Sequence, residues 1–193
     1  MGAHSKPAAR GRGILAGLLE WVVVIVAVVA AVQLVKAFVA EPYFVPTASM
    51  EPTIMPGDSV IAEKLSIRLS GGVERGDIVV FENPDPEEGH EILVKRVVAT
   101  EGQTVDIVYG ADGQGRVSVD GEVLDESYAV GSTEQLAADV AFPLTVPDGC
   151  VWLMGDNREN SADSRVFGPV DVDDVVGVVV FRYWPLGRVG AVE

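Results

Sequence analysis

The sequence predicts a mainly β, antiparallel domain that follows one N-terminal transmembrane helix. Three observations lead to this fold class. A long apolar segment lies near the N-terminus, 27 of the 36 valines follow residue 40, and the valine-rich runs beyond that point are short and separated by turn residues. β-Branched residues favour strands, and short apolar runs bounded by Gly, Asp and Pro are typical of antiparallel sheets joined by tight turns.

Charge and hydropathy are distributed unevenly along the chain. The 193 residues carry a formal net charge of −15 at a mean hydropathy of +0.28, an unusual combination for one evenly mixed domain. Residues 1–40 hold four basic residues and one acid, net +3, whereas residues 41–193 hold ten basic residues and 28 acids, net −18. The acidic part excludes nucleic acid as a partner, because phosphate binding requires a basic surface.

The apolar segment is predicted to form a membrane anchor over residues 14–40. Its 22 residues 14–35 extend about 33 Å as a helix, enough for a bilayer core of roughly 30 Å. Two alternatives are a buried core helix and a cleavable signal peptide cut after a small residue such as Ala31 or Ala37. The apolar stretch exceeds the 7–15 residues of a signal-peptide core, and this favours an uncleaved anchor.

The residues before the anchor predict its orientation. Lys6, Arg10 and Arg12 precede it, and residues 1–13 contain no acid. By the positive-inside rule, residues 1–13 are cytoplasmic and residues 41–193 form an extracytoplasmic domain of a single-pass plasma-membrane protein.

The extracytoplasmic domain is predicted to contain seven main strands. They are Asp58–Ala62, Asp77–Phe81, Ile92–Ala99, Thr104–Val108, Val117–Val119, Val151–Met154 and Val175–Tyr183. Helical signals are confined to Glu134–Asp139 and to a turn at Asp171–Asp174. Residues 110–147 are rich in Gly, Ser and Ala with weak periodicity, and we interpret the region of about 103–149 as a cap or insertion.

Three polar segments hold the candidate chemistry, and the first is Pro46–Thr53. Two prolines restrict the backbone around Ser49, so its hydroxyl can be held at the fixed angle that a nucleophile needs. The alternative is a turn serine in a linker bounded by prolines.

The second polar segment is the Lys95–Arg96 pair inside an apolar strand. Burial among apolar neighbours lowers the pKa of a lysine from about 10.4. An amine that is neutral near pH 7–8 can act as a general base. The alternative is a lysine on an edge strand that keeps its charge in water.

The third polar segment, Gly155–Arg165, directly follows an apolar strand. Its composition fits a plain surface loop. Charge pairs between Asp163 and Arg165, and between Asp156 and Arg158, would instead lock its shape, as a loop that orients catalytic groups requires.

The two histidines are poor candidates for the base of a Ser-His-Asp triad. His4 precedes the anchor, and His90 lies in an acidic loop where we expect it to be solvated. If Ser49 is a nucleophile, lysine is the available base, and Ser–Lys pairs are a recognised variant of the triad. The single cysteine, Cys150, excludes an intramolecular disulfide and a Cys-based zinc site, and we expect it to be a small buried residue.

Together the three segments resemble the motifs of bacterial type I signal peptidases. The family pattern P-[ST]-x-S-M-x-P-T matches Pro46–Thr53, K-R-[VA]-[VI] matches Lys95–Val98, and G-D-N-[RS]-x-x-S-x-D-S-R matches Gly155–Arg165. The resemblance extends from about Glu20 to Trp184 and includes the preceding anchor. One mild departure is Glu159, which stands where Asp is common.

The resemblance implies a fold of the signal peptidase and repressor-protease type, and a membrane-bound serine endopeptidase. Such an enzyme removes N-terminal signal peptides from exported preproteins and cleaves after small residues at Ala-x-Ala-like sites. It implies no metal and no cofactor. The expected partners are exported preproteins and the lipid bilayer, and we expect a monomer.

Roles carry over only to the matching positions. Ser49 matches the nucleophile, Lys95 the general base, Thr47 the hydroxyl that forms an oxyanion hole with the Ser49 N–H, and Ser161 the serine that orients the lysine amine. The remaining matches are a supporting ion pair, Asp163 with Arg165, and three residues expected to form apolar substrate pockets, Val45, Met50 and Val94.

Three rival functions have distinguishing features. A self-cleaving Ser–Lys regulator of the repressor type usually carries a DNA-binding module where this chain has an anchor. The eukaryotic-like signal peptidases use histidine where Lys95 stands. An inactive membrane-anchored binding module is disfavoured by the intact Ser49, Lys95 and Ser161.

Four apolar residues near the site could contact the membrane: Tyr43, Phe44, Met55 and Trp184 either enter the outer leaflet or belong to the core.

Overall fold

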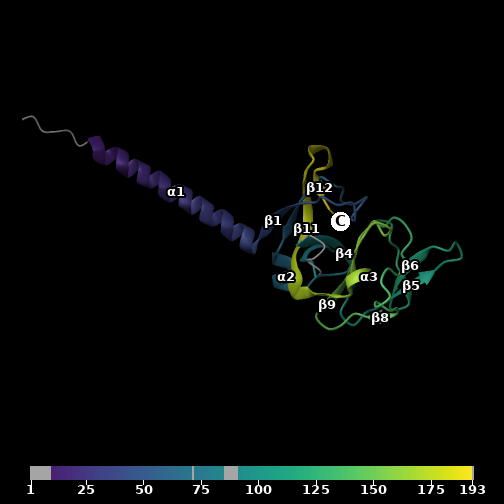
Figure 1. Ribbon diagram of the computed structural model, residues 1–193. Helices are drawn as coiled ribbons and strands as arrows, with labels where there is room; N and C mark the ends of the chain where they lie inside the picture. Colours follow the sequence, from purple (N-terminus) through teal and green to yellow (C-terminus); the bar gives the residue numbers. More distant parts are fainter. Residues whose placement is uncertain (1–9, 71, 85–90, 193) are drawn as a thin grey trace, which may run out of the picture. The chain divides into compact units, whose positions relative to one another are not determined.

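The structure is a computed structural model that describes residues 10–70, 72–84 and 91–192. The chain divides into two compact units, the first ending at Val39 and the second beginning at Ala40 (Figure 1). The expectations for His4, for His90 and for the acidic loop that holds it fall outside the described residues.

The first unit contains helix α1, Arg10–Phe38. Its stretch Ala16–Phe38 is 23 residues long, is apolar enough to cross a membrane, and is not buried. A helix that is apolar on every side and exposed along its length does not belong to the core of a soluble domain, so the alternative of a buried core helix is wrong. The helix ends earlier than expected, because Ala40 already pairs in the first strand.

The second unit is built on an eight-stranded sheet in which all neighbouring strands are antiparallel, as predicted. The strand order is β1-β2-β11-β3-β4-β9-β10, and β12 pairs with β11. Strand β4 therefore lies inside the sheet and β1 at its edge. The strands are β1 (Ala40–Phe44), β2 (Ser59–Glu63), β3 (Ile78–Glu82), β4 (Ile92–Thr100), β9 (Cys150–Met154), β10 (Val170–Asp171), β11 (Val175–Trp184) and β12 (Gly190–Ala191).

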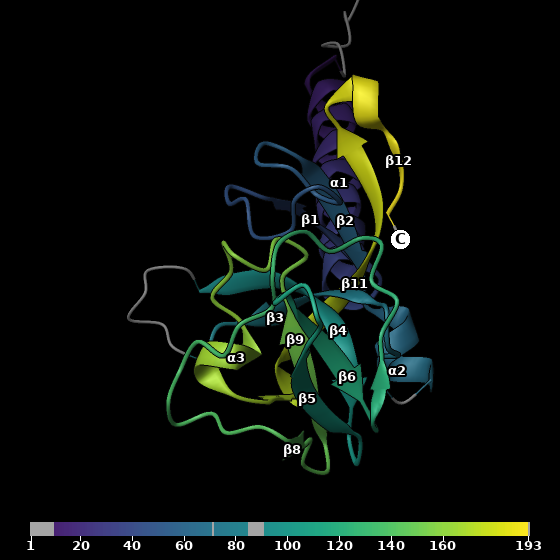
Figure 2. The ribbon, with the colours of Figure 1, turned by 90° about the vertical axis from the view of Figure 1, so that its right-hand side faces the viewer.

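A second, four-stranded sheet has the order β7-β6-β5-β8. In both ribbon views it lies at the opposite end of the unit from strand β12 (Figures 1 and 2). Trp152 of β9 is fully buried beneath it with Val105 and Val117, and the ring of Phe142 meets the Trp152 ring edge-on at 5.5 Å. Its strands are β5 (Thr104–Tyr109), β6 (Gly115–Val119), β7 (Glu122–Val123) and β8 (Leu144–Thr145).

The helices of the second unit are short. They are α2 (Leu65–Ser70), α3 (Ser164–Phe167), and the 3₁₀ turns η2 (Val172–Asp174) and η3 (Leu186–Arg188). The turn predicted at Asp171–Asp174 is confirmed as η2. The helix predicted at Glu134–Asp139 is wrong, because this segment bonds elsewhere: the Gln135 side chain donates to the carbonyls of Ala137 and Val140, and the Ala137 N–H donates to Arg165.

All seven predicted strands are present, and no end differs from the prediction by more than two residues. Strand β1 was not predicted, because Pro42 interrupts it. Proline cannot donate a ladder hydrogen bond, and it is tolerated here because β1 is an edge strand. Cys150 is half-buried rather than buried, which corrects the expectation for this residue.

The core below the main sheet is sensitive to loss of volume at Phe81. This side chain is fully buried on β3, and its ring centroid lies 6.2 Å from that of Phe167. We expect Phe81→Ala to lower the free energy of unfolding by about 3–5 kcal/mol, through lost burial and the cavity left behind. Urea unfolding of the detergent-solubilised chain, followed by tryptophan fluorescence, measures this.

The matched control is Phe44→Ala, because Phe44 is 66% exposed. We expect this control to change the free energy of unfolding by less than about 1 kcal/mol. An equal loss in the two variants would contradict the assignment of Phe81 to the core.

Candidate active site

Ser49 lies in the loop that connects β1 to β2. The loop is closed at its base by two backbone hydrogen bonds, from Val45 to Asp58 at 2.9 Å and from Gly57 to Val45 at 2.8 Å. Met50 and Ile54 are fully buried in the same apolar cluster as Val45. The apolar side chains therefore anchor the loop in the core on both sides of Ser49.

Lys95 projects from the middle of the sheet toward this loop. Its Nζ lies 2.9 Å from the Oγ of Ser49 and also donates to the carbonyl of Val94 at 3.2 Å. Ser49 is 9% exposed and Lys95 only 3%. The structure thus brings the two predicted residues into hydrogen-bond contact, and the alternative of a solvated edge-strand lysine is wrong.

Burial changes the acidity of the Lys95 amine. Desolvation lowers the pKa of Lys95 from 10.5 to about 8. The charges of Asp163 and Asp156 oppose this shift, and the charge of Arg165 reinforces it. An appreciable fraction of the amine is therefore neutral near pH 8 and able to accept a proton.

A groove of about 460 Å³ opens beside the pair. One wall is the segment 43–50, which includes Val45, Thr47 and Met50, and the other is the segment 91–95, which includes Val94. The four residues Ile92–Lys95 pair with β3, whereas the pairing of β4 with β9 begins only at Arg96. This part of β4 therefore has a strand edge that β9 does not occupy.

Thr47 and Ser161, whose hydroxyls match the family motifs, lie near the Ser49–Lys95 pair, but neither forms a hydrogen bond with Ser49 or Lys95 in the described part of the chain. Thr47 is exposed in the groove wall. Ser161 is buried, and its hydroxyl contributes to the lowered pKa of the neighbouring Asp163 carboxyl. A Cβ at Gly155 would lie 2.3 Å from the Ser161 Oγ and 2.5 Å from the carbonyl oxygen of Ser49, so Ser161 packs close to the loop that carries Ser49. The roles given to Thr47 and Ser161 stay predictions.

Asn157 holds the backbone of the loop that carries Ser49, and it was not among the predicted site residues. Its N–H donates to the carbonyl of Ser49 at 3.0 Å, and its side-chain amide donates to the carbonyl of Ala48 at 3.2 Å. The side chain of Thr53 donates to Asp156 and so adds a third link to the segment Gly155–Arg165, here called the polar loop. The sequence could have pointed to Asn157 through its position, because it lies inside the polar segment Gly155–Arg165 that was expected to orient catalytic groups.

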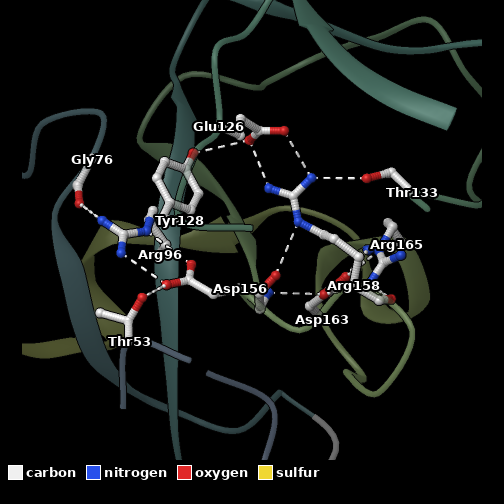
Figure 3. A network of polar contacts seen from close by, with 11 residues as sticks. Thr53, Gly76, Arg96, Glu126, Tyr128, Thr133, Asp156, Arg158, Asp163 and Arg165 are labelled. Carbon is white, nitrogen blue, oxygen red and sulfur yellow. Dashed lines mark hydrogen bonds and ion pairs between the residues drawn. The ribbon is translucent and has the colours of Figure 1, made fainter. Parts of the chain in front are cut away.

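The polar loop is locked by buried ion pairs (Figure 3). Asp163 and Arg165 form the predicted pair: both are fully buried, and two guanidinium nitrogens each lie 2.8 Å from a carboxylate oxygen. Burial alone would raise the pKa of Asp163, but the Arg165 guanidinium and the Gly155 N–H lower it below its ordinary value. The carboxylate is therefore held in its charged form.

The predicted pair between Asp156 and Arg158 is wrong. Asp156 accepts two hydrogen bonds from Arg96, at 2.8 and 2.9 Å, and Arg158 pairs with Glu126. The cause is the turn of the chain after β9, which brings Asp156 against the neighbouring strand β4 and Arg158 against the segment that follows β7 (Figure 3).

Known proteins resemble this chain over most of its length. The family model for signal peptidase, peptidase S26, matches residues 18–184. The probable signal peptidase I-2 of Synechocystis sp. is 39% identical over 162 residues, which cover 81% of this chain and 68% of that protein. The probable signal peptidase I-1 of the same organism is 38% identical, covering 81% and 78%.

A third relative matches over a longer range. The signal peptidase IB of Staphylococcus aureus is 33% identical over 185 residues, which cover 89% of this chain and 92% of that protein. The matched region includes all three polar segments on which the site is built. The chain therefore belongs to the signal peptidase family, peptidase S26, and is a serine peptidase.

Proposed function

We infer that this chain removes signal peptides from exported preproteins with Ser49 as the nucleophile and Lys95 as the general base. The observation that carries this proposal is the 2.9 Å approach of the Lys95 amine to the Ser49 hydroxyl, in a buried pair on the wall of an open groove. A nucleophile needs a base within hydrogen-bond reach, and a lysine whose pKa is lowered by burial supplies one.

In the proposed reaction, neutral Lys95 takes the hydroxyl proton as Ser49 Oγ attacks the scissile carbonyl. The Ser49 N–H and the Thr47 hydroxyl stabilise the resulting oxyanion. Protonated Lys95 then gives its proton to the leaving amine as the C–N bond breaks. Water, deprotonated by Lys95, attacks the acyl-enzyme. The bond from the acyl carbon to Ser49 Oγ then breaks, Lys95 returns the proton to Oγ, and the acid product leaves; Ser161 orients the amine throughout.

The open edge of β4 supports a mode of substrate binding. An extended peptide that adds to the Ile92–Lys95 edge would fix its scissile carbonyl through backbone hydrogen bonds. The apolar groove residues Val45, Met50 and Val94 would then receive the side chains at the −1 and −3 positions. We propose that these pockets accept small residues such as alanine.

The proposed location is the plasma membrane. Helix α1 would cross it once, with the basic residues Lys6, Arg10 and Arg12 in the cytoplasm and the catalytic domain of residues 41–193 outside. Phe44 and Trp184 are 66% and 52% exposed, and we propose that they contact the outer leaflet. A domain of net charge −18 is not attracted by anionic head groups, so such contact rests on apolar side chains. We propose a monomer, because one chain supplies both Ser49 and Lys95.

The dyad is tested by removing each member. We expect Ser49→Ala and Lys95→Ala each to lower kcat/KM for a purified preprotein by about 10³-fold or more, since both residues act on the same proton. Lys64→Ala is the matched control, because Lys64 lies outside the groove and pairs with Glu41. Full activity in either dyad variant would exclude the Ser–Lys mechanism.

The pH dependence tests the desolvation of Lys95. Because the protonated amine cannot accept a proton, we expect kcat/KM to rise about tenfold per pH unit below the pKa of about 8, and to level off above it. Initial rates between pH 6 and 10 measure the acid limb. An apparent pKa near 10.5 for the acid limb would still be consistent with Lys95 as the base, but it would contradict the lowering of the Lys95 pKa by desolvation.

The close packing at Gly155 gives a third test. A Cβ there would overlap the Ser49 carbonyl oxygen and the Ser161 hydroxyl, so we expect Gly155→Ala to displace the nucleophile loop and lower kcat by about 100-fold. Gly187→Ala is the matched control, since its Cβ would meet nothing within 4 Å. Unchanged cleavage by Gly155→Ala would show that the site tolerates movement of this loop.

A further inference from the structure

The segment Glu126–Thr133, here called the inner cap segment, leaves the second sheet after β7 and runs along the polar loop. The N–H of Val130 donates to the carbonyl of Asp156 at 2.8 Å, and the N–H of Arg158 donates to the carbonyl of Val130 at 2.9 Å. These bonds flank Asn157, the residue that holds the backbone of Ser49. The inner cap segment is therefore paired directly with the part of the loop that touches the nucleophile.

Glu126 neutralises a buried arginine in this loop. Arg158 donates to both carboxylate oxygens of Glu126, at 2.6 and 2.9 Å, and to the hydroxyl of Thr133 at 2.8 Å (Figure 3). Its Nε donates to the carbonyl of Gly155 at 3.0 Å. One nearly buried guanidinium thus ties the start of the polar loop to two residues of the cap. Leaving the charge of Arg158 unpaired at this buried position would destabilise the folded protein.

Tyr128 holds the second arginine of the network. Its ring centroid lies 4.0 Å from the Arg96 Cζ, a cation–π contact, and its hydroxyl donates to Glu126 at 2.9 Å (Figure 3). Arg96 is the residue that follows the proposed base, and it donates two hydrogen bonds to Asp156. Tyr128 therefore covers the ion pair that lies between the base strand and the polar loop.

Glu159, the residue that departs from the usual family motif, also contacts this segment. Its carboxylate accepts from the Ser132 N–H at 3.2 Å. A Cβ at Gly131, where φ is +84°, would lie 2.7 Å from the Glu159 Cγ. The close fit shows that the inner cap segment follows the polar loop to its exposed side.

The inner cap segment contributes little to the apolar core. The cap residues that are buried beneath the second sheet include Val105, Val117 and Val119, all outside the segment, whereas Val130 is exposed. Its described interactions are mainly polar. Ser132 and Thr133 bond to Gly115 of β6, and the other main contacts are directed at the polar loop. This distribution fits an element that sets the position of the loop better than one that stabilises a core.

We propose that the inner cap segment positions the polar loop, Gly155–Arg165, with Glu126 and Tyr128 as its positioning residues. Through Arg158 and Arg96 they fix Asp156 and Asn157, and Asn157 fixes the carbonyl of Ser49. The proposal rests on the proposed function, because its effect is on turnover by the Ser49–Lys95 pair. It assigns a task in the reaction to a region that lies outside the three sequence motifs.

The test compares variants of the full-length, detergent-solubilised enzyme on a purified preprotein. We expect Glu126→Gln and Tyr128→Leu to lower kcat about tenfold or more and to change KM by less than about twofold, because the groove is intact while the nucleophile is displaced. Tyr128→Phe keeps the ring over Arg96, and we expect it to restore kcat to within about threefold of wild type. Glu122→Gln is the matched control, since Glu122 is exposed on β7.

Near-UV circular dichroism of each variant gives the folded fraction at the assay temperature. If Glu126→Gln does not fold, Tyr128→Leu, which leaves both buried arginines paired with carboxylates, carries the test. A kcat per folded molecule equal to that of wild type in both variants, or a rise in KM alone, overturns the proposal. Failure of the wild type to cleave the preprotein would instead refute the proposed function, and this inference with it.

Discussion

The burial of one amine against one hydroxyl is the constraint on which the rest of the site depends. Lys95 loses water and its pKa falls, but nearby carboxylates raise that pKa again. Asp163 and Asp156 both exert this effect, and each is matched by an arginine, Arg165 or Arg96. The buried ion pairs therefore fix the shape of the polar loop, and the pKa of Lys95 stays lowered, at about 8, despite the two carboxylates.

The rigidity of the main sheet serves this arrangement. Strand β4 provides two consecutive residues with opposite tasks: Lys95 faces the groove, and Arg96 binds Asp156 of the polar loop. The loop that carries Ser49 reaches the same strand by a separate route, anchored by Met50 and Ile54 in the core and by Asn157 at its carbonyls. Because two independent supports meet at Ser49, its distance from Lys95 does not depend on the flexibility of one loop.

Much of the fold follows from local patterns. Valine-rich runs predicted the seven main strands, and the apolar segment predicted α1, because each signal lies within one element. The contact of Ser49 with Lys95 was predictable only through the motifs, since 46 residues separate the two. The pairings of Arg96 with Asp156 and of Arg158 with Glu126 were not predictable, because nearer opposite charges compete in the sequence and only the turn after β9 decides between them.

If a preprotein binds along the edge of β4 that β9 does not occupy, as proposed, this mode of binding has a consequence for the range of proteins that can be processed. A bare strand edge offers main-chain donors and acceptors, which are the same for every amino acid, so recognition through it carries almost no information about sequence. It does demand that the incoming chain be extended. Whether a preprotein is cleaved would then depend on how it folds next to the cleavage site. An exported protein that folds tightly up to its first residue would shield the bond to be cut, whereas one that begins with a short unstructured segment would expose it.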